Sequence, residues 1–284
     1  MRLNPFNPGS INVGTTGGGV GKAGGLGCGT IILAAIGYFV FGLDPMQTAA
    51  TIEGVQGGGQ VESAPANEDA RAICSSNAYA TETCNALGSL NETWQPIFQQ
   101  AGAQFQQPTL RFATASRFNT GCGAASTGMG PFYCPADGTI YIDTGFYDEL
   151  ARMSGNSGDF ARYYVIAHEY GHHVQTITGV SEQIRSAQSA NPRAANQLQV
   201  LMELHADCYA GVWAGRNRNL IEPGDLEEGL MAASAIGDDT LQRQAGRRVD
   251  AESFTHGTSE QRMQALRLGM QGDDTACDRI LQAG

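Results

Sequence analysis

The stretch AHEYGHH at residues 167–173 contains the pattern HExxH, and it decides how the rest of the chain is interpreted. On an α-helix, residues four apart lie on the same face, so His168 and His172 can present two imidazoles to one Zn²⁺. Glu169 lies beside them, where it can take a proton from a water molecule on the metal. His173 is turned about 100° away from this face, which favours a structural role.

The flanks of this pattern predict a buried helix. An apolar run, YYVIA at residues 163–167, leads into the pattern. Gly171 costs a helix about 1 kcal/mol relative to alanine, which makes sense where a metal ion or another backbone comes close. Two core histidines held by hydrogen bonds are the alternative, but they leave Glu169 unexplained. We therefore expect a metal-binding helix over Phe160–Thr176, with Asp159 as its N-cap.

A catalytic zinc needs a third protein ligand, and ELHADCYA at residues 203–210 offers one. Glu203 and Asp207 again lie four apart, so Glu203 could bind the metal while Asp207 accepts the second ring N–H of a ligand histidine. The rival ligand His205 lies about 200° around the helix from Glu203, and the two cannot point at one metal. Asp207 would hold a ligand histidine in place when Glu203 binds the metal, and this companion favours Glu203 over His205 as the third ligand.

Around these two helices the patterns predict an α+β domain over residues 67–284, mostly helical with a small antiparallel sheet or hairpin. Pro192 can open the second helix, which runs to about Arg216. Two aromatic and β-branched runs flank an Asp-Gly turn at residues 132–143, a pattern typical of a hairpin. Further helices are expected over residues 70–87 and 91–100, and a strand over residues 110–113.

The N-terminal part of the chain carries Arg2 and Lys22 but no acidic residue. Residues 1–22 are rich in Gly, Asn and Thr, and we expect them to be disordered. Residues 23–43 are uncharged and, as a helix, would span roughly 31 Å, close to the hydrocarbon thickness of a bilayer. They predict a transmembrane anchor, followed by a flexible linker over residues 44–66.

A cleaved signal peptide, with Thr48–Ala50 as its cleavage site, is the alternative to this anchor. Either interpretation exports the domain to the periplasm or the cell exterior, because the basic flank stays in the cytoplasm. In the anchored interpretation the lipid bilayer is a partner of the N-terminal helix. Gly21, Gly25 and Gly29 have the spacing that lets such helices pair into a homo-oligomer, although a glycine-rich tract also produces this spacing by chance.

Cysteine usage agrees with export. Six cysteines follow the predicted anchor, and an even number in an exported domain predicts three disulfides. We expect two of the bonds to close short local loops and the third to tie the C-terminal tail to a central helix. The expected bonds are Cys74–Cys84, Cys122–Cys134 and Cys208–Cys277. Six reduced core cysteines are the alternative, which fits a cytosolic protein better than an exported one.

The charge balance excludes several classes of partner. The chain has 284 residues, of which 17 are basic and 28 acidic, and its formal net charge is −11. So acidic a chain lacks the basic surface that binding a phosphate backbone needs, and we expect no nucleic acid as a partner. Lys22 is the single lysine, so no polybasic patch can hold an anionic membrane surface.

The pairing of HEYGHH with ELHADCYAGVW, behind an N-terminal apolar segment, resembles the bacterial neutral zinc metallopeptidases. These are similar to gluzincin proteases, in which a helix bearing HExxH is followed by one bearing ExxxD. The resemblance covers roughly residues 67–282 and implies a zincin-like fold, one Zn²⁺ per chain and a peptide or protein substrate. It implies zinc ligands at His168, His172 and Glu203, a catalytic base at Glu169 and a supporting role for Asp207.

The segment SFTHGTS at residues 253–259 also resembles the C-terminal signature of this family. Its His256 could donate a hydrogen bond to the oxyanion of a tetrahedral intermediate, which would make it a second catalytic residue. A capping or core histidine beside Gly257 is the alternative, and the pattern leaves both open.

Two other functions fit the same residues. A catalytically inactive envelope protein could keep a structural zinc, or only the scaffold. A zinc amidase acting on a non-peptide envelope substrate would need the same site and would differ only in what it cleaves. The peptidase itself is expected to hydrolyse peptide bonds with a zinc-activated water and Glu169 as general base. Replacing Glu169 by glutamine separates an enzyme from a scaffold.

Overall fold

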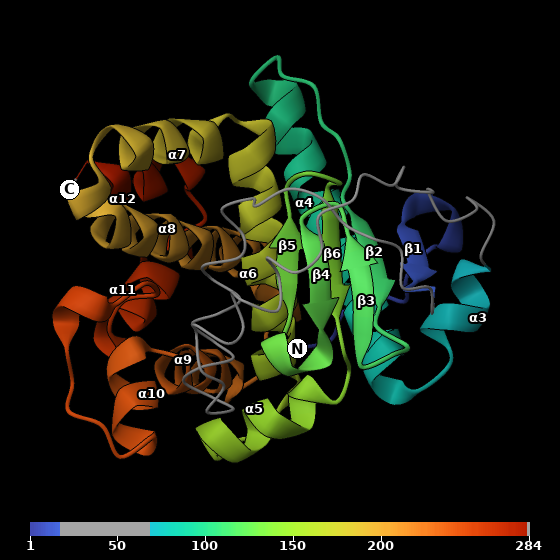
Figure 1. Cartoon of the computed structure of the whole chain (residues 1–284). Helices are drawn as coiled ribbons and strands as arrows, with labels where there is room; N and C mark the ends of the chain where they lie inside the picture. The colour runs from blue at the N-terminus through green and yellow to red at the C-terminus, as the bar shows by residue number, and fades with distance from the viewer. Residues whose placement is uncertain (18–68, 283–284) are drawn as a thin grey trace.

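The computed structural model describes residues 1–17 and 69–282. Strands lie on one side of the molecule and most helices on the other, with helix α6 (Asp159–Ile177) between them (Figure 1). The predicted anchor, the linker, the alternative cleavage site and the glycine spacing all lie outside the described residues. No helix within the described ranges has both the length and the apolar character that crossing a bilayer requires.

Helix α6 packs on α8 (Ala195–Arg216), and this crossing brings the two sequence motifs together. Gly171 allows the close approach, since a Cβ atom there would lie 2.8 Å from the backbone oxygen of Ala206. A larger residue would push the two backbones apart. The sequence predicts that Gly171 lies against either a metal ion or another backbone, and the structure places it against the backbone of α8. The burial that the apolar lead-in predicted is confirmed, because α6 is buried along most of its length.

Helix α8 is held in turn by α11 (Ser259–Gly269), the helix that follows the SFTHGTS segment. Gly269 lies so close to α8 that a Cβ atom there would overlap the backbone oxygen of Cys208. Helix α9 (Asp225–Ala235) packs on both α6 and α11. The three helices α6, α8 and α11 are therefore locked at short distances, and we call them the helical wall.

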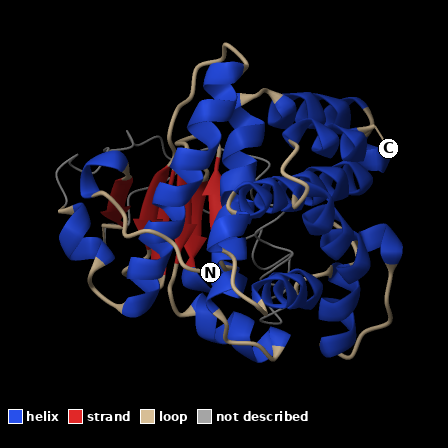
Figure 2. Cartoon of the chain, turned by 180° about the vertical axis from the view of Figure 1, so that it is seen from behind, coloured by secondary structure: helices blue, strands red, loops and turns tan. Residues whose placement is uncertain are grey.

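The main sheet has four strands in the order β1-β2-β6-β5. Strands β1 (Asn12–Thr15), β2 (Thr109–Phe112) and β6 (Thr139–Ile142) are parallel, whereas β5 (Phe132–Cys134) is antiparallel to β6. The predicted hairpin is thus confirmed, whereas the expected antiparallel sheet is wrong for β1, β2 and β6, which pair in parallel because long stretches of chain separate β1 from β2 and β2 from β6. Figure 2, seen from behind, shows helices covering the far face of this sheet. Strand β5 forms one edge of the sheet and packs on α6.

A two-stranded sheet lies beside the main one and shares a small core with strands β5 and β6. It consists of β3 (Arg117–Thr120) and β4 (Gly123–Ser126). The ring centroid of Phe118 lies 6.4 Å from that of Phe132 of β5 and 5.6 Å from that of Tyr141 of β6, and the rings of Phe132 and Tyr141 are 5.1 Å apart. These contacts belong to a cluster separate from the main hydrophobic core.

The three expected disulfides are present, and each closes a different part of the fold. Cys74–Cys84 joins helix α3 (Ala70–Cys74) to helix α4 (Ala78–Gln100), and Cys208–Cys277 ties the C-terminal residues to α8. Cys122–Cys134 joins the turn of the β3–β4 hairpin to β5. Cys122 is partly exposed, whereas the other five half-cystines are fully buried.

Three predicted helix boundaries are wrong. The helix expected to open at Pro192 begins at Ala195, because Pro192–Ala194 form a separate 3₁₀ turn. The helix expected over residues 70–87 is interrupted, because α3 (Ala70–Cys74) ends and Asn77 caps a new helix, α4 (Ala78–Gln100), which runs unbroken through residues 91–100. Asp159 is the first residue of α6, and the N-cap is Gly158. The other helices are α5 (Phe146–Ser154), α7 (Val180–Ala190), α10 (Asp238–Gln244) and α12 (Asp278–Leu281). Short 3₁₀ helices lie at Pro8–Ser10, Thr127–Met129, Pro192–Ala194, Arg218–Leu220, Ala251–Ser253 and Asp274–Cys277.

The prediction of a disordered N-terminus is wrong for residues 1–17. Strand β1 pairs with β2 along its full length. The amino group of Met1 lies 2.9 Å from a carboxylate oxygen of Asp159 and 2.9 Å from one of Asp225. Composition missed this order because a short polar strand gains its structure from its pairing partner rather than from its own hydrophobic pattern.

Candidate metal centre

Helices α6 and α8 bring three donor groups to one point. His168 and His172 project from α6 one turn apart, and Glu203 projects from α8. The Oε2 atom of Glu203 lies 3.2 Å from Nε2 of His168 and 3.4 Å from Nε2 of His172. The two imidazole rings are nearly perpendicular, at 84°, with centroids 4.8 Å apart. Two nitrogen donors and one oxygen donor thus converge from separate helices.

The spacing of these atoms fits a zinc ion. In a tetrahedral site with metal–ligand bonds of about 2.0–2.1 Å, neighbouring ligand atoms lie about 3.3 Å apart. The separations from Glu203 to the two imidazoles match this value. Two imidazoles and one carboxylate leave a fourth position open, which is typical of catalytic zinc and not of structural zinc. These three residues could therefore hold Zn²⁺.

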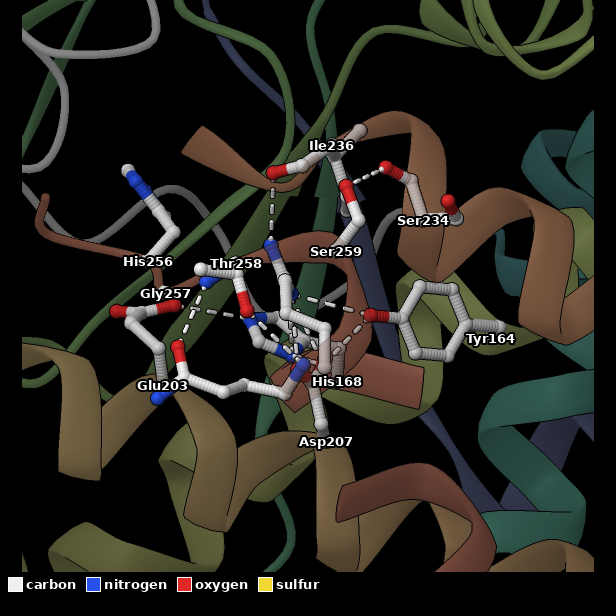
Figure 3. Close-up of polar contacts among 12 residues, drawn as sticks. Tyr164, His168, Glu203, Asp207, Ser234, Ile236, His256, Gly257, Thr258 and Ser259 are labelled. Atoms are coloured by element: carbon white, nitrogen blue, oxygen red, sulfur yellow. Dashed lines mark hydrogen bonds and ion pairs between the residues drawn. The ribbon is translucent and has the colours of Figure 1, made fainter. Parts of the chain in front are cut away.

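Behind His168 lies a buried network that fixes the orientation of its ring. A carboxylate oxygen of Asp207 lies 2.7 Å from Nδ1 of His168 and accepts a 2.6 Å hydrogen bond from the hydroxyl of Tyr164. Arg262 donates two hydrogen bonds to Asp207, of 2.8 and 2.9 Å, and a third to Tyr164. Figure 3 shows Tyr164, His168 and Asp207 gathered by these contacts. Because Asp207 occupies Nδ1, the Nε2 atom of His168 is left to face the metal position.

Charges within the helical wall set the electrostatics of the site. Burial alone would lower the pKa of His168, but Asp207 and Glu203 raise it to about 10. Burial alone would raise the pKa of Asp207, but Arg262 and His168 bring it down to about 2. The two histidines likewise hold the pKa of Glu203 well below its usual range despite its burial. The carboxylates therefore remain charged and favour a cation between the imidazoles.

Glu169 lines the cleft beside the donor atoms. Burial raises the pKa of its carboxyl, while His168, His172 and a hydrogen bond from the backbone N–H of Tyr133 counteract the rise. Tyr133 belongs to the edge strand β5, so this contact links the helix of the HExxH pattern to the sheet. A carboxyl group whose pKa is raised at such a position is suited to accept a proton and return it.

His256 also lines this cleft. Asp238 accepts hydrogen bonds of 2.7, 2.6 and 3.0 Å from the backbone N–H groups of Thr255, His256 and Gly257, and it lies 3.2 Å from Nδ1 of His256. The loop and the ring are thus both fixed by one carboxylate. The Nε2 atom of His256 is buried and has no hydrogen-bond partner among the described residues. Figure 3 shows His256 on the same side of the site as Glu203.

The two remaining histidines lie outside the group of donor atoms. Nε2 of His173 lies 2.6 Å from the backbone oxygen of Gln106, and its Nδ1 lies 3.2 Å from the hydroxyl of Tyr133. His173 therefore joins α6 to the strands. Nδ1 of His205 lies 3.2 Å from the side-chain amide of Gln175, away from the metal position.

Sequence reasoning missed five residues that support the site. Gln175 lies 2.9 Å from Nδ1 of His172, and Gln199 donates a 2.9 Å hydrogen bond to Glu203. Tyr164 and Arg262 complete the network around Asp207, and Asp238 fixes His256. Tyr164 was seen only as part of an apolar run, and Arg262 lies 55 positions after its partner Asp207. No local sequence pattern marks a buried arginine on a helix, because its role depends on which distant carboxylate the fold places beside it.

Comparisons with known proteins agree with this geometry. A family model described as "Putative neutral zinc metallopeptidase" matches residues 7–280. The chain belongs to this family. The matched range begins before β1, so the family model includes the N-terminal strand as well as the metal centre. The resemblance inferred from the two motifs is therefore confirmed, and the family implies zinc as the metal.

Relatives are found in Escherichia coli and in Mycobacterium tuberculosis. The chain is 43% identical over 249 residues to "Uncharacterized protein YpfJ" of Escherichia coli (strain K12), which covers 87% of this chain and 83% of that protein. It is 40% identical over 209 residues to "Uncharacterized protein Rv2575" of Mycobacterium tuberculosis (strain ATCC 25618 / H37Rv), covering 69% of this chain and 68% of that protein. No solved structure matches the chain.

Proposed function

We propose that this protein is a zinc-dependent peptidase that hydrolyses peptide bonds in an extended substrate. The observation that carries the proposal is the convergence of His168, His172 and Glu203 in a cleft that Glu169 and His256 also line. Zn²⁺ held by the three ligands would acidify water and polarise a carbonyl group. The remaining chemistry belongs to side chains of this chain.

Glu169 is the proposed general base. It is held beside the ligands by its place on α6 and by the N–H of Tyr133, and its raised pKa favours proton transfer near neutral pH. It takes a proton from the attacking water and passes it to the leaving amine. His256 is the proposed donor to the oxyanion. Its Nδ1 atom faces Asp238, and its Nε2 atom, which has no partner among the described residues, is the atom that would donate into the cleft.

Strand β5 is the proposed docking edge for the substrate. It lies at the edge of the main sheet and beside the helix that carries Glu169. An extended peptide can add to such an edge through main-chain hydrogen bonds. The Cys122–Cys134 bond and the β3–β4 hairpin support β5, so loss of this bond should weaken substrate binding more than catalysis.

We also propose that the domain works outside the cytosol. Three disulfides in a chain of this size are typical of an oxidising compartment. Rapid alkylation of thiols in intact cells, followed by mass spectrometry, checks this location. Six alkylated cysteines in the domain would contradict it.

The decisive experiment is Glu169→Gln. The substitution keeps the size of the side chain and removes the base, so we expect unchanged zinc content and a fall in peptide hydrolysis of at least about 100-fold. Zinc is measured by metal analysis and hydrolysis with a quenched fluorescent peptide library, with and without chelator. The exposed Glu182→Gln on α7 is the matched control and should keep full activity. Equal activity of the two variants would refute the peptidase mechanism and favour a scaffold role.

A further inference from the structure

The cleft follows one face of α6 on both sides of the metal centre. Val165, His168, His172 and Thr176 line it, and they recur every three or four residues along the helix. Between the first and the last of them the helix rises by about 16 Å, at 1.5 Å per residue. An extended peptide advances about 3.3 Å per residue, so a segment of about five residues can lie along this face.

The two ends of the cleft differ in chemistry. Near the start of α6 its lining is apolar, with Phe146 and Met153 from α5 joining Val165. Near the end of α6 the lining is polar and comes from α7. Figure 1 shows α5 and α7 at opposite ends of α6.

The polar end is formed by one face of helix α7. Ser181, Arg185 and Gln188 line the cleft, and their spacing of four and three residues places them on one side of the helix. Ile184, which is buried, anchors the helix from another side. The charge of Arg185 reaches Tyr133 across the cleft, where it opposes the rise in the pKa of that phenol caused by burial. Arg185 therefore faces the groove beside β5.

Arg185 differs from the other arginine in the cleft. Arg262 is neutralised by Asp207, whereas Arg185 is half-buried and has no hydrogen bond or ion pair with any described residue. A zinc ion would be balanced by the carboxylates of Glu169 and Glu203, so the positive charge of Arg185 is left over. The chain has a net charge of −11, so acidic side chains are plentiful, and yet none of the described ones pairs with Arg185. Its guanidinium is therefore available to bind an anion of a ligand.

We infer that Arg185 recognises a carboxylate of the peptide substrate and sets the specificity of the enzyme at the α7 end of the cleft. A guanidinium binds a carboxylate through two parallel hydrogen bonds, which gives both strength and direction. The carboxylate is either an acidic side chain or the C-terminal group of the peptide, about two residues from the scissile bond. This inference rests on the proposed peptidase function and adds its substrate class.

The test compares matched peptides on matched variants. A quenched peptide series carries Glu or Gln at each position within three residues of the cleavage site, and each member is made with a free or an amidated C-terminus. The proteins are the wild type, Arg185→Gln, the charge reversal Arg185→Glu and the exposed control Arg193→Gln. Binding of the same peptides to zinc-loaded Glu169→Gln, with and without Arg185→Gln, is measured by fluorescence anisotropy and needs no hydrolysis.

In the wild type and in Arg193→Gln, we expect the carboxylate form at one position to be preferred over its amide form by about tenfold in kcat/KM, mostly through KM. The preference should disappear in Arg185→Gln, turn toward the amide form in Arg185→Glu, and weaken at high salt. A preference confined to the free C-terminus identifies the terminal group, and one confined to Glu identifies the side chain. Equal cleavage and equal binding of acid and amide forms would overturn the inference while leaving the peptidase intact. Peptides that bind with the Arg185-dependent preference but are not cleaved would support the inference and refute the peptidase.

Discussion

The helical wall and the β3–β4 hairpin both reach the cleft, the hairpin through Cys122 at its turn, and they are built in different ways. In the wall, α6, α8 and α11 approach backbone to backbone at glycines, and a buried arginine neutralises a buried aspartate behind the metal ligands. The hairpin shares a small core with β5 and β6, separate from the main core, and one partly exposed disulfide ties it to β5. The wall is suited to fixing donor atoms, and the hairpin to supporting the strand on which a substrate lies. The difference suggests that metal binding and substrate binding can be perturbed separately.

The largest effect on the wall should come from Arg262→Met. This change leaves Asp207 buried without its cation, which costs about 3–5 kcal/mol of unfolding free energy. With His168 less firmly oriented, zinc affinity should fall about 10–100-fold. Thermal unfolding and competition with a chromophoric chelator measure the two quantities.

Two further variants make this result specific. Arg267→Met removes an exposed arginine from the same helix and should change neither quantity. Arg262→Lys keeps the charge but loses the paired hydrogen bonds, so it should fold and still bind zinc more weakly than the wild type. A Met variant with native stability and zinc affinity would show that Asp207 does not depend on Arg262.

The residues of this wall that could be predicted from sequence are pairs spaced four positions apart on one helix. His168 with His172, and Glu203 with Asp207, follow from the four-residue repeat of a helix, and the same geometry separated Glu203 from His205. Arg262 and Asp238 could not be found in this way, since they act on residues 55 and 18 positions away. Strand β1 was missed for the same reason, because its partner β2 lies far along the chain.

A smaller effect should follow from breaking the hairpin side with the double change Cys122→Ser and Cys134→Ser. Opening a loop of this length removes about 3 kcal/mol of stabilisation by chain entropy. We expect faster hydrogen exchange in β3, β4 and β5, a higher KM for peptides, and unchanged zinc affinity. Exchange mass spectrometry and steady-state kinetics measure these outcomes. A loss of zinc instead of a rise in KM would mean that the two sides of the cleft are not independent.

The smallest effect concerns His205, a buried histidine of the wall whose Nε2 atom lies 3.7 Å from a carboxylate oxygen of Asp278. Burial, with a contribution from His172, lowers the pKa of His205 to about 4. The unfolded chain, with a pKa near 6.5, then binds the proton first as the pH falls, so stability that is present above pH 6.5 is lost progressively toward pH 4. The loss from this residue is about 2 kcal/mol at pH 5.

The variant His205→Gln should be less sensitive to acid than the wild type. Unfolding is followed by urea titration at pH 7.5 and at pH 5, and the difference between the two pH values is compared for the two proteins. If the variant loses as much stability as the wild type, other groups cause the acid sensitivity.

The pairing of β1 with β2 has a consequence for membrane topology. A segment that crosses a bilayer once leaves its two flanks in different compartments. Residues 12–15 and 109–112 lie on either side of the apolar segment 23–43, yet they are hydrogen-bonded neighbours in one sheet. A single membrane crossing by this segment and the pairing of β1 with β2 therefore exclude each other. An anchored form with a cytoplasmic N-terminus would leave the edge of β2 unpaired, ready to accept a strand from elsewhere.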